Sequence, residues 1–353
     1  MVGSPQSKTS VDAVNSANHY RLSDFCSIAG ERGEQGSSSM ATAERRSAKV
    51  FDRMVSSKFR GRTVRTGVAG PETGERVLLV HGFGATCEHW RNVVPSLVSS
   101  GYRVLAPDLL GFGSSDKPES AELYCMETWA SQLLEINALN GRDGMAPKSL
   151  VDSSPPMVAA VGNSIGSLAS LEAARQGGPS TVAGACLLNC AGGQNSKALA
   201  FSDWRTALLY PLLKLVDLAL MIDGVPQALL ERIRTEDTVR NLLQAVYHDQ
   251  SAVDQELVDF IREPAFSSGA SASLRNVLSN SPGPNPFEII NQLDSSQKLL
   301  TIWGEDDIIA PIGGLVGRWF ANTLPEEGSG SVAEFVRVQD CNRALYYYIC
   351  LII

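Results

Sequence analysis

The sequence predicts an α/β protein with a mostly parallel β-sheet, helices on both faces of the sheet, and an inserted helical cap. Short apolar runs of five to eight residues alternate with amphipathic stretches from about Thr63 onward. Glycine-rich turns follow several of these runs, and one long helical insertion interrupts the alternation. Strands that alternate with helices are typical of parallel sheets, whose ligands gather at the carboxyl ends of the strands.

The composition excludes several classes of protein. A chain of 353 residues with 44% hydrophobic and 19% charged residues is typical of a globular protein with a large core. The net charge of −8 comes without a basic stripe, so no nucleic-acid partner is expected. No apolar run approaches the ~20 residues that cross a bilayer, so no membrane span is expected.

No cofactor and no metal are expected. The seven cysteines form no CxxC pair and no metal-ligand spacing, and no G-x-G-x-x-G opens the first helix. The cysteines are at positions 26, 87, 125, 186, 190, 341 and 350.

Residues 1–48 are rich in Ser, Gly, Gln and Asn and lack hydrophobic periodicity, which predicts a disordered extension. No apolar core of a secretory signal is present. Residues 1–22 hold a single acid, Asp12, as a transit peptide would, but the five acids of the whole extension argue against one. The compartment, cytoplasm or plastid, stays open.

Helices are expected at Glu88–Ser99 and Ile165–Gln176, and residues 140–156 read as a Gly/Ser/Pro surface loop. Between residues 196 and 293 the pattern gives several helices, which fall between two strands and should form a lid above the sheet. The strands are expected at 63–69, 76–80, 103–107, 157–162, 182–189, 299–304 and 333–338. The expected organisation is an extension (1–48), a first part of the core (49–195), a cap (196–293), a second part of the core (294–340) and an aberrant hydrophobic tail (341–353).

The stretch "AAVGNSIGSLAS" fits the pattern G-x-S-x-G, after a strand and before a helix. Gly162 and Gly166 allow the strand and the helix to approach closely, and the strained turn presents Ser164 as a nucleophile.

The stretch "VLLVHGFG" ends another strand. Its loop holds His81, Gly82 and Gly84 as supporting residues, and a backbone N–H, that of Phe83, is expected to join the N–H of Ile165 in an oxyanion hole. The polar turn "PDLLGFGSSD", with Asp108, is expected to be scaffold for the site.

The stretches "HGFG…HWR", "PDLLGFGSSDKP", "GNSIGS" and "WGEDDIIAP" resemble, in that order, the α/β-hydrolase fold superfamily over about residues 60–340. The likeness is to its capped AB hydrolase-1 members, the plant and cyanobacterial pheophytinase-like and epoxide-hydrolase-like proteins. Epoxide hydrolases and haloalkane dehalogenases of that family carry an aspartate at the elbow, whereas this chain has Ser164. The resemblance therefore implies hydrolysis of an ester-type or C–C bond. It also implies that Asp307, in a G-x-x-D-x-x-x-P pattern, orients the base, with Asp306 as the alternative.

The base is the residue in which this sequence departs from the family. The family's histidine follows the next strand, but Asn342 and Arg343 stand where Gly-His is expected, and no histidine follows His248. Arg343 cannot act as a base, because its guanidinium stays protonated. The other histidines are expected to serve elsewhere: His19 lies in the extension, His81 holds its loop, His89 lies one turn into a helix, and His248 lies in the lid.

The uncharged run "LYYYICLII" has the composition of an aggregation-prone segment. We expect that the C-terminal end of the fold is truncated or aberrant, and that the authentic protein continues with Gly-His and a closing helix. A real truncated isoform is the alternative, and the transcript sequence distinguishes the two.

Three functions remain open. The first is a capped serine hydrolase acting on an ester-type small molecule, whose apolar nature the lid's apolar helices suggest, with activity in doubt because the base is absent. The others are a non-catalytic protein that binds a small ligand in the same pocket, and a C–C bond hydrolase. The sequence does not define the substrate or the oligomeric state.

Overall fold

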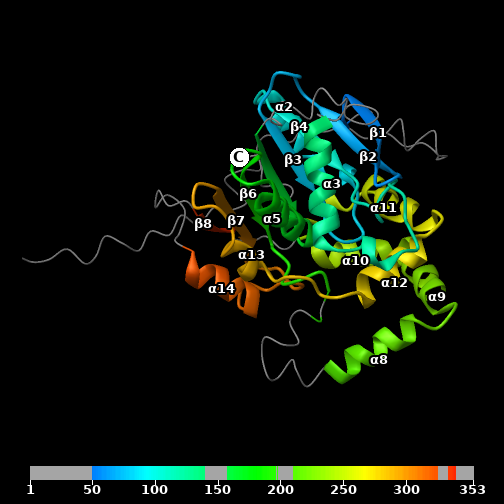
Figure 1. Cartoon of the computed structure of the whole chain (residues 1–353). Coiled ribbons are helices and arrows are strands. Elements are labelled where there is room, and N and C mark those ends of the chain that lie inside the picture. The colour runs from blue at the N-terminus through cyan, green and yellow to red at the C-terminus, as the bar shows by residue number, and fades with distance from the viewer. Residues whose placement is uncertain (1–49, 140–156, 196, 198–209, 325–332, 339–353) are drawn as a thin grey trace, which may run out of the picture.

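The computed structural model describes residues 50–139, 157–195, 197, 210–324 and 333–338. Eight strands form one sheet in the order β1-β2-β4-β3-β5-β6-β7-β8 (Figure 1). Strands β3 to β8 run parallel to one another, and β2 is antiparallel to both of its neighbours, β1 and β4, so the predicted, mostly parallel sheet is confirmed. The strands span Arg53–Phe59 (β1), Arg62–Ala69 (β2), Arg76–Val80 (β3), Arg103–Pro107 (β4), Val158–Asn163 (β5), Val182–Leu188 (β6), Lys298–Gly304 (β7) and Ala333–Val338 (β8).

Strand β1 was not among the predicted strands. It pairs with β2 through a two-residue turn at Arg60 and Gly61, whose φ values are 47° and 77°. Two positive φ values in succession suit the right-handed twist of a hairpin. The alternation of buried and exposed residues along β1 then places Val55 and Phe59 in the core.

The sheet carries an apolar cluster on each face. Leu78 and Val80 of β3 point to one side, which α3 (Met126–Leu139) and α5 (Ile165–Gly177) cover. Val77 and Leu79 point to the other side, which α2 (Val94–Ser99) helps to cover. This alternation of successive side chains is the rule for a strand buried on both faces.

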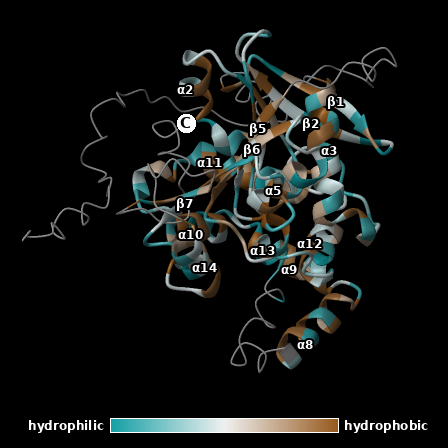
Figure 2. Ribbon diagram, turned by 60° about the vertical axis from the view of Figure 1, so that its left-hand side comes forward, coloured by the Kyte–Doolittle hydropathy of each residue, from teal (hydrophilic) through white to brown (hydrophobic). Residues whose placement is uncertain are grey.

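The insertion between β6 and β7 is helical, as the sequence predicts, and contains α8 (Tyr210–Leu220) to α13 (Pro286–Ile290). Two of its helices join the core directly, because Val239, Leu243, Leu257 and Val258 belong to the same apolar cluster as Val77. Helix α8 instead extends away from the sheet, and several of its residues are hydrophobic (Figures 1 and 2). The exposed apolar side chains on it are Leu212, Leu215, Val216 and Leu218. The other described helices are α9 (Val225–Ile233), α10 (Glu236–Val246), η4 (Gln250–Ala252), α11 (Gln255–Arg262), η5 (Glu263–Phe266) and α12 (Ala270–Ser279), with η3 (Ala121–Leu123) and α14 (Leu315–Thr323) outside the insertion.

The single helix predicted at Glu88–Ser99 is wrong. The structure has a 3₁₀ helix, η2 (Cys87–Trp90), then a turn, and then α2. Pro95 stands in the first turn of α2, where its missing N–H costs no hydrogen bond, and it therefore starts a new helix. No helix in the described ranges is long and apolar enough to cross a membrane. The predicted extension (1–48), the loop (140–156) and the tail (341–353) lie outside the described residues.

Candidate active site

Ser164 lies in a sharp turn between β5 and α5. Its backbone has φ 56° and ψ −118°, a conformation that is strained for serine. A Cβ atom on Gly162 would come within 2.2 Å of the carbonyl oxygen of Gly166, and one on Gly166 within 2.4 Å of the carbonyl oxygen of His81. Only glycine fits at these two positions, which is the physical basis of the G-x-S-x-G spacing.

The loop after β3 lies against this turn. A Cβ atom on Gly82 would be 3.4 Å from the Cβ atom of Ser164, so the backbone before Phe83 approaches the serine closely. On the other side, Ile165 begins α5. Ser164 keeps 4% of its accessible surface, whereas Phe83 is 45% exposed. Ser164 is therefore almost fully buried beside an exposed aromatic ring.

Asp307 follows β7 and is buried, with 1% of its surface exposed. Its Oδ1 accepts hydrogen bonds from the backbone N–H groups of Ile309 (2.7 Å) and Ala310 (2.8 Å). Its Oδ2 accepts a 2.7 Å bond from the side-chain amide of Asn189. These donors fix the carboxylate in one orientation at the carboxyl edge of the sheet.

Asn189 connects the end of β6 to the end of β7 and the turn after it, and sequence reasoning missed it. It follows β6 with a φ of 42°, and its Oδ1 accepts from the backbone N–H of Gly304 at the end of β7. The preceding residue, Leu188, accepts a 3.0 Å hydrogen bond from the N–H of Ser164. The available signal was a polar residue directly after an apolar strand, at the edge where ligands bind.

The histidines near the serine have different environments. Both ring nitrogens of His81 are engaged, Nδ1 with the carbonyl of Gly82 (2.8 Å) and Nε2 as acceptor from the N–H of Leu109 (3.0 Å). Burial lowers the pKa of His81. His89, in η2, places Nε2 2.7 Å from the hydroxyl of Tyr247, and desolvation lowers the pKa of His89 to about 3.

His248, the residue after Tyr247, lies near the turn that follows β7. His248 lies with its Nδ1 3.9 Å from Oδ2 of Asp306, and about half of each side chain is exposed. Asp306 is the neighbour of Asp307 in the turn after β7. Residues 339–353, which include the position where the sequence pattern expects a base, lie outside the described residues.

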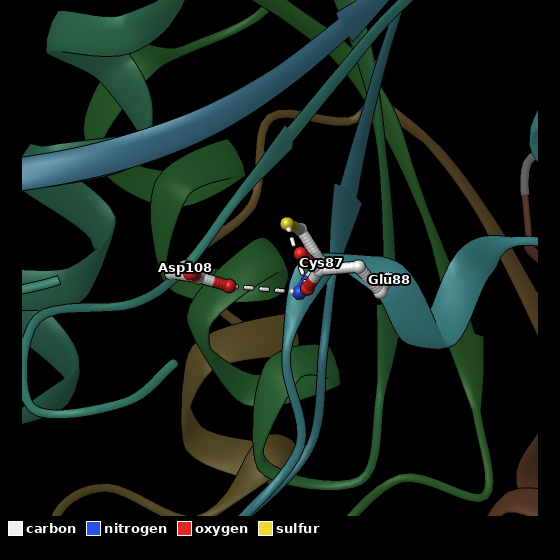
Figure 3. A group of neighbouring side chains, drawn as sticks. All are labelled: Cys87, Glu88 and Asp108. Atoms are coloured by element: carbon white, nitrogen blue, oxygen red, sulfur yellow. Dashed lines mark hydrogen bonds between the residues drawn. The ribbon is translucent and has the colours of Figure 1, made fainter. Parts of the chain in front are cut away.

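Cys87, Glu88 and Asp108 form a buried group next to the loop, and their potential ligand atoms lie within 4.8 Å of one another (Figure 3). Arg65 of β2 is the cation of this group: Nε is 2.8 Å from Asp108, and Nη2 is 2.7 Å from Glu88. Burial raises the pKa of the Cys87 thiol well above its usual value. Because Arg65 pairs with both carboxylates, the group has the geometry of a buried ion-pair network.

The ion-pair network around Arg65 also holds the segment that follows β3 in place. Asp108 accepts a 2.8 Å hydrogen bond from the backbone N–H of Cys87, drawn as a dashed line in Figure 3, and another from that of Ser114. Burial alone would raise the pKa of Asp108, but the charge of Arg65 and these hydrogen bonds hold it below its usual range. Arg65 was also missed, because an arginine within a strand has no distinguishing pattern in one sequence.

Comparison with known proteins agrees with this architecture. The model of the alpha/beta hydrolase family matches residues 77–342, and the chain belongs to that family. It is 39% identical over 76 residues to the AB hydrolase superfamily protein YfhM of Bacillus subtilis, which is 22% of this chain and 27% of that protein. It is 42% identical over 74 residues to a haloalkane dehalogenase of Psychrobacter cryohalolentis, 20% of this chain and 24% of that enzyme.

The matched segment thus spans about a quarter of these relatives. Among solved structures, the epoxide hydrolase CorEH aligns with a TM-score of 0.60 and 16% identity, covering 85% of this chain and 95% of that one. This likeness concerns the fold alone.

Proposed function

We propose that this chain is a serine hydrolase that acts on an ester-type, apolar small molecule, with residues 196–293 as a cap over the site. The observation that carries the proposal is the turn at Ser164, whose strained backbone is held between two close glycine contacts and lies against Gly82. Strain of this kind persists only where the surroundings enforce it, and it clusters at functional sites.

In the proposed reaction Ser164 Oγ attacks the acyl carbonyl as a base takes its proton. The N–H groups of Phe83 and Ile165 hold the negative oxygen that forms, and a carboxylate of the Asp306–Asp307 turn steadies the base. Oxyanion donors of this kind contribute ~10²–10³ in rate each. Water then hydrolyses the acyl-enzyme.

Two features favour an apolar ester. The nucleophile position holds serine, not the aspartate that the family's epoxide hydrolases and dehalogenases use. Apolar side chains are exposed on the loops that follow β3 and β7, at the same edge of the sheet as Ser164. Neither of these two loops carries an exposed lysine or arginine. These side chains are Phe83, Ile308 and Ile309.

A fluorophosphonate probe tests the proposal, since it phosphonylates activated serines. The full chain, Ser164→Ala and the control Ser99→Ala should be compared by intact mass. Ser99 is suited as a control because it lies at the end of α2 and its hydroxyl is bonded to the carbonyl of Ser96. Labelling of the chain and of the Ser99 variant, but not of Ser164→Ala, supports the hydrolase. No labelling favours the non-catalytic ligand-binding protein.

A further inference from the structure

We infer that two copies of this chain associate through the exposed face of α8, helix against helix. Six apolar side chains on α8 and on the turn that continues it each keep between 48% and 68% of their accessible surface, and we call them the outer face of α8. Figure 2 shows the hydrophobic colouring of this helix. The inference does not depend on the proposed hydrolase function. The outer face consists of Leu212, Leu215, Val216, Leu218, Met221 and Ile222.

The opposite side of α8 is fixed to the body of the protein. Nζ of the buried Lys197 lies 3.1 Å from the carboxylate of Asp217 and donates a 2.8 Å hydrogen bond to the carbonyl of Ser279, at the end of α12. Leu220 is 3% exposed, and α8 contacts α12 and α9. Turning the outer face inward would break this buried ion pair, so the outer face is directed away from the rest of the described chain.

The outer face has the spacing of a helix–helix seam. Leu215, Leu218 and Ile222 follow one another at intervals of three and four residues. Side chains with this spacing form one line along a helix and pack into the grooves of a second helix. The turn after α8 continues the line, because the backbone N–H of Ile222 donates to the carbonyl of Ala219. The pattern therefore fits another helix as the occupant.

The size of the outer face suits a symmetric pair. The exposed fractions of the six side chains amount to on the order of 600 Å², which is the upper end of the apolar patches that monomers expose. Two such faces together bury about 1,200 Å², the lower limit of a specific and stable interface. A symmetric pair also needs only one kind of surface, since each copy presents the same residues to the other.

The charges of α8 favour a second copy over a lipid surface. A helix that lies on a membrane usually carries several lysines and arginines, which face the anionic headgroups. The only charged residues of α8 are Lys214 and Asp217, whose charged groups lie 3.6 Å apart. The whole chain carries a net charge of −8, which anionic headgroups repel. Two copies of an apolar, nearly uncharged helix face are complementary to each other.

Sedimentation velocity of the full chain over a wide range of concentrations tests the inference, in reducing buffer because the described cysteines are free thiols. The mass should rise from 37.8 kDa toward twice that value as the concentration increases. The double variant Leu215→Glu/Leu218→Glu should stay at the single mass, because pairing would bury unpaired carboxylates. Leu242→Glu, at a 54% exposed position on α10, is the control and should associate like the wild type.

A mixing experiment tests the contact between the two helices directly. Leu218 lies in the middle of the seam, so the two copies of it meet in an antiparallel pair. Leu218→Glu and Leu218→Lys should each remain at the single mass alone and should associate when mixed, which also shows that both variants are folded. Failure of the mixture to associate would contradict contact between the α8 helices.

Three other results would overturn the inference. The first is a wild-type chain that keeps the single mass at every concentration. The second is association that is unchanged in Leu215→Glu/Leu218→Glu, because another surface would then hold the pair. The third is a chain that keeps the single mass but floats with phosphatidylcholine vesicles through the outer face, which would assign this face to a lipid surface.

Discussion

The side-chain amide of Asn189 donates a 2.7 Å hydrogen bond to the carboxylate of Asp307, and its carbonyl oxygen accepts from the N–H of Gly304. One side chain at the end of β6 thereby joins the turn after β7 to β6, which pairs with β5, the strand that precedes Ser164. The turn that carries Asp306 and Asp307 keeps its position relative to Ser164 through this contact.

Asn189→Ala should therefore weaken the fold and the site together. The substitution removes one of the donors to a buried carboxylate, and a lost bond to a charged group costs about 1.5–3 kcal/mol. Urea unfolding should show this loss of free energy. Asn291→Ala, at an exposed position after α13, is the matched control and should unfold like the wild type. An unchanged midpoint for Asn189→Ala would contradict the role given to this bond.

Gly166→Ala should destabilise the chain and abolish labelling of Ser164. The added Cβ would lie 2.4 Å from two backbone oxygens, those of Val80 and His81, so strand and helix must separate. Overpacking of this kind costs about 1–3 kcal/mol. Gly313→Ala adds the same atom where nothing lies within 4 Å, and it should leave both properties unchanged. Wild-type labelling by Gly166→Ala would show that the close approach is dispensable.

Arg65→Met should be strongly destabilising, because it leaves the buried carboxylates of Glu88 and Asp108 without their cation. Breaking a buried ion pair from one side costs about 3–5 kcal/mol. Arg62→Met, an exposed position on the same strand, provides the comparison in thermal or urea unfolding. If the two variants unfold alike, the network does not hold the loop. A gain in the stability of Arg65→Met on addition of a divalent cation would instead indicate that Cys87, Glu88 and Asp108 can hold a metal ion.

The part-buried ring of His89 predicts a pH dependence of stability. Its pKa is lowered to about 3 in the fold, against about 6.5 in the unfolded chain. Between these values the unfolded state binds more protons, so the free energy of unfolding should fall as the pH drops from 6.5 toward 3, by up to ~1.4 kcal/mol per unit. Above pH 6.5 His89 is neutral in both states, and the stability linked to its neutral ring is fully present.

His89→Gln isolates this effect, since glutamine can still bond to the Tyr247 hydroxyl but does not titrate. Unfolding curves at several pH values should show a shallower loss for the variant than for the wild type. Equal slopes would mean that the environment of His89 does not disfavour its charged form.

Much of the fold was predictable, because period-two apolar runs and the glycine turns after them depend on local sequence. All seven predicted strands are present within a residue of their expected ends. Strand β1 was missed because its pairing depends on the turn at Arg60 and Gly61, and arginine rarely adopts a positive φ. The packing of α10 and α11 into the core of the sheet was also beyond the sequence, which gives periodicity but not partners.

The sharp turn at Ser164 and its flanking glycines was predictable, because the G-x-S-x-G pattern fixes its backbone geometry. It was not predictable where residues far apart meet. Arg65 reaches Asp108, and Asn189 reaches Asp307, only through the order of strands in the sheet. The contact between His248 and Asp306 depends in addition on the path of the lid, which no local pattern determines.

The most direct measurement is a crystal structure of the chain after reaction with a fluorophosphonate. The account predicts phosphorus bonded to Ser164 Oγ, with one phosphoryl oxygen ~2.7–3.1 Å from the backbone nitrogens of both Phe83 and Ile165, the distances of a working oxyanion hole. Phosphorus on another side chain, or an oxygen turned away from both nitrogens, would contradict it.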